Sequence, residues 1–383
     1  MPFFLLTVLS IYSAVHVYTF FKVKAAFPFG LRKGILLGIF FALMECSLIL
    51  IRILVKYGYD SPARVLAYIG YCWMGVLFLF FTLSILTDLY CLSLKVISLV
   101  FHNDMTSLIP SAKQILLIPL FLGLSFSLYG YFEALNIRPV HITIRSPKIP
   151  EAVGHIRIAQ ISDVHMGLIV QEDRIRKMIK VIQEAHPDIL ISTGDFVDGQ
   201  MDNLAGFADL FKEIKPRYGK YAITGNHEFH AGIAEGIEIN RRAGFTMLRN
   251  QSVNVAGLIN IAGVDYTLGR HSGIPDKNIL SKLPGDKFTI LLKHAPIVDQ
   301  SALGLYDLQL SGHTHGGQIF PFRLIIRIFN PYIMGWYNLP YGSHLYVSKG
   351  TGTWGAPMRF LTSPEVTVID LIHDNQPRPN THS

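Results

Sequence analysis

His155-Ile-Arg-Ile-Ala-Gln-Ile-Ser162 is a short apolar run that leads directly into Asp163-Val164-His165, a cluster with two metal-binding side chains. Four more apolar runs lead into clusters of the same kind. These are residues 188–193 before Gly194-Asp195, 221–224 before Gly225-Asn226-His227-Glu228, 288–293 before His294, and 308–311 before Gly312-His313-Thr314-His315. Short, partly β-branched runs predict buried strands. Since parallel strands present their carboxyl ends at one edge of a sheet, the five clusters are expected to converge.

A core-facing helix is expected between the first two predicted strands. Within residues 172–185, Ile175, Met178, Ile179 and Ile182 follow the i, i+3, i+4, i+7 spacing of an amphipathic helix. The local order is therefore strand, helix, strand.

The converging side chains offer carboxylate, amide and imidazole ligands without thiolates, because all three cysteines lie before residue 92. This mixture suits manganese, iron or zinc. A site that hydrolyses phosphate esters with two ions about 3.5–4 Å apart needs one carboxylate to bridge them. Asp195, which follows Gly194 at a predicted strand end, is the candidate bridge.

The order DxH, GDxxD, GNH(D/E), His and GHxH resembles the calcineurin-like metallophosphoesterases over about residues 138–372. The resemblance implies a β-sandwich flanked by helices and two divalent ions (Mn, Fe or Zn). It also implies hydrolysis of a phosphodiester or phosphomonoester by attack of a metal-bridging hydroxide. By motif position, the ligands of one ion are Asp163, His165, His315 and bridging Asp195, and those of the other are Asp195, Asn226, His294 and His313.

The resemblance also suggests roles beside the metals. His227 would contact the phosphoryl group and protonate the leaving oxygen, so that His227 and bridging Asp195 are the expected catalytic residues. Asp198 and Glu228 would orient His227 and the surrounding loop. Among the other histidines, His230 lies close enough in sequence to touch substrate. His155, His186, His271 and His344, which match no motif position either, are expected to be surface or structural residues.

Two differences separate the chain from protein phosphatases of this fold, which carry phosphate-binding arginines where Gly199 and Thr224 stand here. The stretches Gly316-Gly317-Gln318 and 347–360 instead resemble the bacterial membrane-associated branch of the family. Within the second stretch, Arg359 is expected either to contact phosphate or to form a structural ion pair.

Four stretches are long and apolar enough to cross a bilayer: residues 3–21, 34–51, 67–87 and 114–132. The first lacks a basic n-region and a small-residue cleavage site, so a permanent anchor is expected. Glu45 inside the second stretch marks either a polar path or a helix contact, and residues 92–101 either continue the third helix or lie along the interface. The predicted organisation is a transmembrane anchor over 1–137, a phosphoesterase domain over 138–372 and a disordered tail over 373–383.

The net charge of +7 does not indicate nucleic acid, because residues 1–140 hold ten Lys or Arg against five Asp or Glu. Lys22, Lys24, Arg32 and Lys33 lie around the first loop between spans, and Lys95 and Lys113 lie around the third. The positive-inside tendency places these loops in the cytoplasm and favours an extracytoplasmic catalytic domain on a bacterial inner or cell membrane. Six opposing basic residues, Arg52, Lys56, Arg64, Arg138, Arg145 and Lys148, make this asymmetry small.

Three functions stay open on the sequence. The favoured one is hydrolysis of a phosphate ester that belongs to a lipid or envelope molecule, since a membrane anchor suggests a membrane substrate. The second is a pyrophosphohydrolase that cuts a UDP-linked acylated sugar in lipid A assembly, which requires a cytoplasmic active site. The third is a non-enzymatic membrane binding module, which is disfavoured because every expected ligand is present. Residues 320–336 mix apolar side chains with two arginines and are expected to form an amphipathic lid at the membrane surface, or else a buried core element.

Overall fold

The computed structural model describes residues 2–199, 204–266, 274–374 and 381–382. The chain divides near residue 132 into two compact units, one helical and one that contains both sheets. Each unit is described by itself below.

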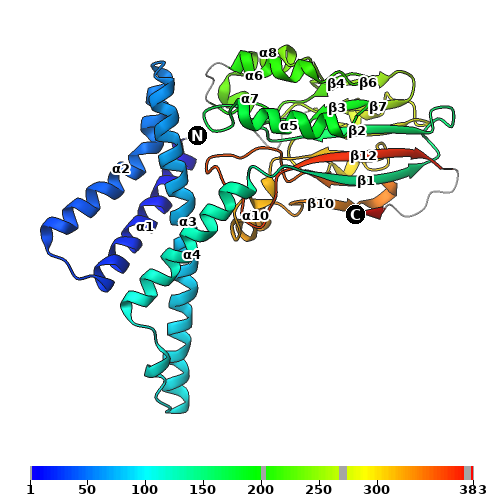
Figure 1. Cartoon of the computed structure of the whole chain (residues 1–383). Coiled ribbons are helices and arrows are strands. Elements are labelled where there is room, and N and C mark those ends of the chain that lie inside the picture. Colours follow the sequence, from blue (N-terminus) through cyan, green and yellow to red (C-terminus); the bar gives the residue numbers. More distant parts are fainter. Residues whose placement is uncertain (1, 200–203, 267–273, 375–380, 383) are drawn as a thin grey trace. The chain divides into compact units, whose positions relative to one another are not determined.

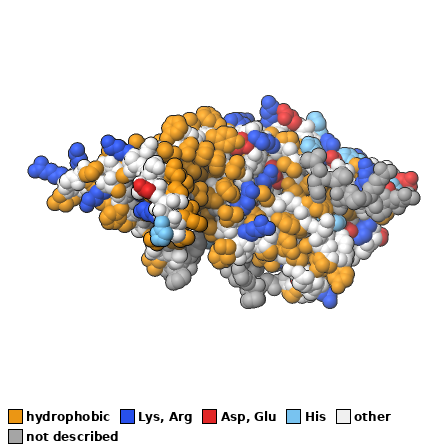
Figure 2. Space-filling view, turned by 90° about the horizontal axis from the view of Figure 1, so that it is seen from below, with side chains coloured by type: hydrophobic (Ala, Val, Ile, Leu, Met, Phe, Trp, Pro, Cys, Tyr) orange, Lys and Arg blue, Asp and Glu red, His pale blue; other side chains and the backbone are white. Residues whose placement is uncertain are grey.

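The first unit consists of four long helices: α1 Pro2–Ala26, α2 Leu31–Lys56, α3 Asp60–Phe101 and α4 Ala112–Glu133, with a 3-10 turn at Thr106–Leu108 (Figure 1). All four are long and apolar enough to cross a membrane, as the sequence predicts, and the chain is a membrane protein. Hydrophobic side chains cover much of the exposed surface of this unit (Figure 2). The segment 92–101 continues the third helix, because α3 runs unbroken for 42 residues to Phe101.

Polar side chains inside the helical unit pair with one another. The Glu45 carboxylate accepts a hydrogen bond from the Ser13 hydroxyl, so it forms a contact between α2 and α1. The Asp88 carboxylate on α3 accepts a hydrogen bond from the Tyr18 hydroxyl at 2.7 Å and pairs with the Lys22 ammonium. Such pairing is expected for ionisable groups in an apolar environment.

The second unit is built on two sheets. The first has the order β13-β1-β12-β2-β3-β4-β5 and the second has the order β10-β11-β9-β8-β7-β6. The strands of the first sheet are β1 Arg138–Ser146, β2 His155–Ile161, β3 Ile189–Ser192, β4 Lys220–Ala222, β5 Thr246–Met247, β12 Glu365–His373 and β13 Thr381–His382. Those of the second are β6 Gln251–Val255, β7 Ile259–Gly263, β8 Phe288–Leu292, β9 Leu308–Ser311, β10 Gly335–Asn338 and β11 His344–Val347. In each sheet the strands that precede the motif clusters run parallel.

The main core lies between the two sheets. Ile156 and Ile158 of β2 pack there with Ile290 of β8 and Leu310 of β9. The intervening side chains of β2 point to the other face, where a second cluster packs against helices. This alternation is the ordinary two-residue period of a strand. The arrangement confirms a β-sandwich flanked by helices.

Helices α5 Glu172–Glu184, α6 Leu204–Leu210 and α8 Ile233–Arg242 lie on the outer side of the first sheet (Figure 1), and α9 Asp276–Leu280 packs on the second sheet. The unit also contains α7 Asn226–Ala231 and α10 Phe322–Phe329, with short 3-10 turns at Phe211–Glu213, Gln300–Ala302, His315–Gly317 and Pro340–Gly342. The predicted helix at 172–185 is confirmed as α5, and its four predicted core residues are all buried.

The boundaries of several elements differ from those expected. Residues 140–144 alternate as in an edge strand, but β1 is longer and lies inside the sheet, because it pairs with β12 on one side and with β13 at Ile142 and Thr143 on the other. β12 extends to His373, which pairs with Ser146, so the ladder continues into the stretch predicted as a disordered tail. Two further tail residues form β13, and residues 375–380 and 383 lie outside the described residues.

Candidate metal centre

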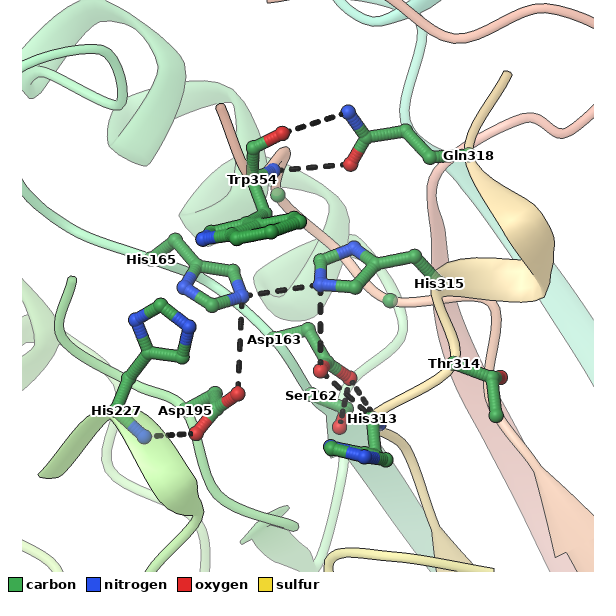
Figure 3. Close-up of polar contacts among 12 residues, drawn as sticks. Ser162, Asp163, His165, Asp195, His227, His313, Thr314, His315, Gln318 and Trp354 are labelled. Atoms are coloured by element: carbon green, nitrogen blue, oxygen red, sulfur yellow. Dashed lines mark hydrogen bonds and ion pairs between the residues drawn. The ribbon is translucent and has the colours of Figure 1, made fainter. Parts of the chain in front are cut away.

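The five motif clusters lie at the carboxyl ends of strands from both sheets. Asp163 follows β2, Asp195 follows β3, and Asn226 begins α7 just after β4. His294 follows β8 in the second sheet, and a loop after β9 carries the last two histidines, His313 and His315. All seven predicted ligands therefore come together at one edge of the sandwich, where Figure 3 shows several of them side by side.

Five of these seven residues have a left-handed backbone. The φ angles are 52° for Asp163, His165 and Asp195, 73° for His313 and 50° for His315. A residue other than glycine seldom adopts this conformation, and clusters of such residues occur mainly at functional sites. The backbone strain is therefore concentrated in the loops that carry the predicted ligands.

Two motif glycines are required by close packing around the acidic residues. A Cβ atom on Gly225 would lie 2.1 Å from Oδ1 of Asp195. A Cβ atom on Gly312 would lie 1.8 Å from the Ser162 hydroxyl oxygen and 2.3 Å from Oδ2 of Asp163. Only glycine leaves room for these carboxylates to face the site.

The first predicted ligand group brings two imidazoles against two carboxylates. The Nε2 atoms of His165 and His315 lie 3.0 Å apart. Nε2 of His315 lies 3.5 Å from Oδ1 of Asp163, and Nε2 of His165 lies 3.9 Å from Oδ2 of Asp195. Burial and the charge of His227 lower the pKa of His165 to about 3, and burial together with Arg359 lowers the pKa of His315 well below its usual value. Both imidazoles are thus neutral, the form that binds a cation.

The second group brings three residues to one point beside Asp195. Oδ1 of Asn226 lies 3.2 Å from Nε2 of His294 and 2.9 Å from Nδ1 of His313. Nε2 of His294 also lies 3.1 Å from Oδ2 of Asp195. The Nδ1–H of His294 donates to the Thr193 carbonyl at 2.8 Å, so Nε2 is the nitrogen that faces the group.

These atoms fit divalent metal ions. The three sets of convergent side chains are Asp163, His165 and His315; His165, Asp195 and His227; and Asp195, His294 and His313, each with ligand atoms within 4.8 Å of one another. Carbonyl, carboxylate and imidazole lone pairs point at one another there, and His165 Nδ1 has no hydrogen-bond partner among the described residues. Hard and borderline divalent ions take this donor set. Which residue binds which ion stays a prediction.

His227 lies beside this cluster and is held by Asp198. Its ring stands 4.5 Å from the His165 ring, and its backbone N–H donates to Oδ1 of Asp195 at 2.8 Å. Nδ1 of His227 lies 3.0 Å from Oδ1 of Asp198. Burial lowers the pKa of His227, but the negative charges of Asp195 and Asp198 outweigh burial and raise it to about 9. His227 therefore carries a proton at neutral pH next to the predicted metal ligands.

Glu228 supports the loop rather than His227. Its buried carboxylate accepts hydrogen bonds from the N–H groups of Asp195 at 3.0 Å, Phe196 at 2.8 Å and Gly225 at 2.7 Å. It thereby ties the loop after β3 to the start of α7. The sequence predicts that Asp198 and Glu228 both orient His227 and the surrounding loop. In the structure, Asp198 contacts His227, whereas Glu228 contacts the loop.

Arg359 has neither of the two roles expected from the sequence. It is fully buried, and no ion pair with a carboxylate is found for it among the described residues. Its guanidinium donates to the backbone carbonyls of Gly352, His315, Lys349 and Gly350. Burial lowers the pKa of Arg359 to about 10. Carbonyl oxygens rather than a carboxylate or phosphate satisfy its donors, so Arg359 fixes the loops that meet behind His315.

His155, His186, His230 and His344 lie outside the convergent groups. His155 forms an ion pair with Asp370 at 2.6 Å, His186 is exposed, and His344 contacts Asn338 at 3.1 Å. His230 is exposed, with its ring 5.6 Å from the ring of His227, and His271 lies outside the described residues.

Sequence reasoning missed the aromatic wall of the site. The Trp354 ring stands 6.1 Å from the His227 ring (Figure 3). Tyr266 lies 5.7 Å from the ring of His294 on the other side. Tyr266 follows no motif, and Trp354 lies in the stretch 347–360 but at no metal-ligand position, so only the folded domain connects them to the site.

A family model described as "Calcineurin-like phosphoesterase" matches residues 156–317. An "Uncharacterized metallophosphoesterase" of Aquifex aeolicus is 37% identical over 257 residues, which cover 66% of this chain and 98% of that protein. A metallophosphoesterase of Bacillus subtilis is 34% identical, over 64% of this chain and 91% of its own. A "Transmembrane protein with metallophosphoesterase domain" of Danio rerio is 31% identical, over 64% and 60% respectively.

The chain belongs to the calcineurin-like metallophosphoesterase family. It is accordingly a metal-dependent phosphoesterase, a hydrolase of phosphate esters, and the site described above contains candidate ligands for its metal ions.

Proposed function

We propose that the chain is a membrane-anchored phosphoesterase that uses two divalent ions to hydrolyse a phosphodiester or phosphomonoester of a lipid or envelope molecule. The observation that carries this proposal is the position of Asp195. Its carboxylate lies 3.1 Å from His294 and 3.9 Å from His165, which belong to the two different ligand groups. One carboxylate between two groups of potential ligands is the arrangement that a pair of ions requires.

Asp163, His165, Asp195 and His315 would hold one ion, and Asp195, Asn226, His294 and His313 would hold the other. When bound, the two ions would supply the nucleophile and neutralise the charge that develops on the phosphoryl oxygens. His227 would give its proton to the leaving oxygen, since the carboxylates beside it keep it protonated near neutral pH. Asp198 would keep the His227 ring aimed at that oxygen.

The substrate is proposed from location. The same chain carries four helices that can cross a membrane, so the catalytic domain works close to lipid headgroups. The domain is proposed to extend over residues 138–372, after an anchor over 1–137. Lys22, Lys24, Arg32, Lys33, Lys95 and Lys113 lie near the first and third loops between helices, which favours an extracytoplasmic catalytic domain. Protease added to intact spheroplasts should then cleave off the domain. A domain that stays protected would indicate the opposite, cytoplasmic orientation.

Hydrolysis by the full chain in detergent tests the function. Bis-p-nitrophenyl phosphate, p-nitrophenyl phosphate and a phospholipid should be offered with manganese and, separately, with chelator. Activity should appear only with metal, and Asn226→Ala should reduce it about a thousandfold or more while lowering the bound metal. Asn278→Ala, which changes an exposed asparagine on α9, is the matched control. Equal activity of the two variants, or hydrolysis that survives chelation, would refute the metal site.

A further inference from the structure

Helix α10 exposes the kind of side chain that the other helices of this domain bury. In α5, Ile175, Met178, Ile179 and Ile182 all face the core. In α10 no residue is buried, and Ile328 and Phe329 are 77% and 66% exposed. The exposed large apolar residues of α10 are Phe322, Leu324, Ile325, Ile328 and Phe329, which are five of the eleven found in the described residues after position 132. Within residues 320–336, the buried alternative is therefore wrong for α10, although Ile333 after it is buried.

The composition of α10 suits a membrane surface. Its sequence, Phe-Arg-Leu-Ile-Ile-Arg-Ile-Phe, contains no acidic residue, and Arg327 is exposed near its end. Eight residues give a helix about 12 Å long, too short to cross a bilayer. A short helix that combines exposed apolar side chains with a cation is typical of segments that lie in the lipid interface.

The helix is attached directly to the loop that carries His313 and His315. Arg323 points inward, where Nε donates to the Gly316 carbonyl at 3.0 Å and Nη2 donates to the carbonyl of Leu361 and the hydroxyl of Thr362, both at 2.8 Å. A Cβ atom on Gly317 would lie 2.6 Å from the Cα atom of Arg323. The backbone of α10 therefore packs against the predicted metal loop, and what binds to α10 is held next to that loop.

Lipid is the partner that fits this surface best. The four helices of the same chain keep a bilayer within reach of the domain, which raises the effective concentration of lipid around α10. Arg327 adds attraction to anionic headgroups. Leu361, 59% exposed and joined to Arg323 through its carbonyl, extends the apolar surface beside the helix.

We propose that α10 docks onto the bilayer that anchors this chain, with its exposed apolar side chains at the boundary between headgroups and acyl chains. The metal centre would then act on phosphate esters that lie in the membrane surface. This choice of substrate rests on the proposed phosphoesterase function, whereas the docking of α10 can be measured without any hydrolysis.

The docking test uses the full chain with its three cysteines replaced by alanine and one new cysteine for an environment-sensitive fluorophore. The new cysteine is Ile328→Cys on α10 or, as a control at another exposed isoleucine of the same domain, Ile274→Cys. The proteins are reconstituted in phosphatidylcholine and phosphatidylglycerol vesicles with or without brominated lipid. The label at 328 should be blue-shifted and quenched by brominated lipid, and the label at 274 should not. A label at 328 that behaves like that at 274, or that is shielded without lipid quenching, overturns the proposal; the second result would indicate a protein partner.

A second test compares two substrates. The double variant Ile328→Asp, Phe329→Asp should lower the hydrolysis of vesicle phospholipid about tenfold relative to a soluble p-nitrophenyl ester, because two apolar contacts with the bilayer are lost. Ile274→Asp should leave this ratio unchanged. An unchanged ratio in the double variant contradicts docking. If the unmodified protein hydrolyses neither substrate, the proposed phosphoesterase function is contradicted instead. Failure of the docking proposal and failure of the proposed function are therefore distinguishable.

Discussion

The side-chain amide of Gln318 forms two hydrogen bonds with the backbone of Trp354. Nε2 of Gln318 donates to the Trp354 carbonyl at 2.8 Å, and Oε1 of Gln318 accepts from the Trp354 N–H at 2.9 Å (Figure 3). Gln318 has a left-handed backbone, with φ of 46°, three residues after His315. The loop that carries two predicted metal ligands therefore also sets the position of the indole beside them.

Replacing Trp354 should weaken binding of an aromatic ester. Stacking on an indole contributes about 1 kcal/mol, so Trp354→Ala should raise KM for bis-p-nitrophenyl phosphate about fivefold and change kcat less than about twofold. Steady-state kinetics measure both. Gln318→Ala should shift KM in the same direction by less. Trp336→Ala is the control, because that indole packs on His344 at 4.8 Å. If KM is the same in all three variants, Trp354 does not contact the ester.

Removing the charge of Glu228 should destabilise the domain. Four backbone N–H groups donate to this buried carboxylate, and the amide of Glu228→Gln would turn donors toward them. The expected loss is about 3 kcal/mol, or about 5–10 °C in Tm. Thermal unfolding of the full chain in detergent measures it. Glu235→Gln, an exposed change on α8, should keep the Tm of the unmodified protein. Equal Tm values for the two variants would show that Glu228 does not support the loop.

The pH profile should depend on Asp198. Negative charge beside His227 raises its pKa to about 9, and activity that needs protonated His227 is lost as pH rises through that pKa. Asp198→Asn removes one of these charges, so the pKa falls and the basic limb should move down by about one pH unit. The pH dependence of kcat/KM measures this. Asp209→Asn, at a half-buried site on α6 that pairs with Arg242 and Lys212 rather than with His227, should leave the limb in place. If Asp198→Asn leaves the basic limb of the pH profile unchanged, Asp198 does not raise the pKa of a catalytic His227.

Metal binding should release a proton from His294. Burial lowers the pKa of His294, but Asp195 and its hydrogen bond outweigh burial and raise the pKa to about 9 in the metal-free protein. Only neutral imidazole binds metal, so the apparent Kd for manganese should fall about tenfold per pH unit between about 7 and 9. Calorimetry in buffers of different ionisation heat counts the protons released. His344→Ala should not change that count. Binding without proton release at pH 7 would contradict the assignment of His294.

Local pattern predicted much of the fold because buried strands and amphipathic helices have distinct periods. The strand at 155–162 was predictable from its apolar run, and α5 was predictable from the spacing of its apolar residues. The pairing of β1 with β13 was not predictable, because two residues near the end of the chain carry no periodic signal. The exposure of α10 was undecided for a related reason: an apolar stretch looks the same whether it faces a core or a lipid surface.

By itself, the sequence determined the family, the four apolar spans and the seven predicted ligands, because these depend on residue type and spacing along the chain. The tertiary structure alone decided which side chains meet, since contacts between distant residues depend on how two sheets pack. It placed Asp195 between both histidine groups, enclosed Arg359 among backbone carbonyls, and brought Trp354 beside His227. Left-handed backbone at Asp163 and four other predicted ligands also appears only in the folded chain, where the surrounding loops hold it.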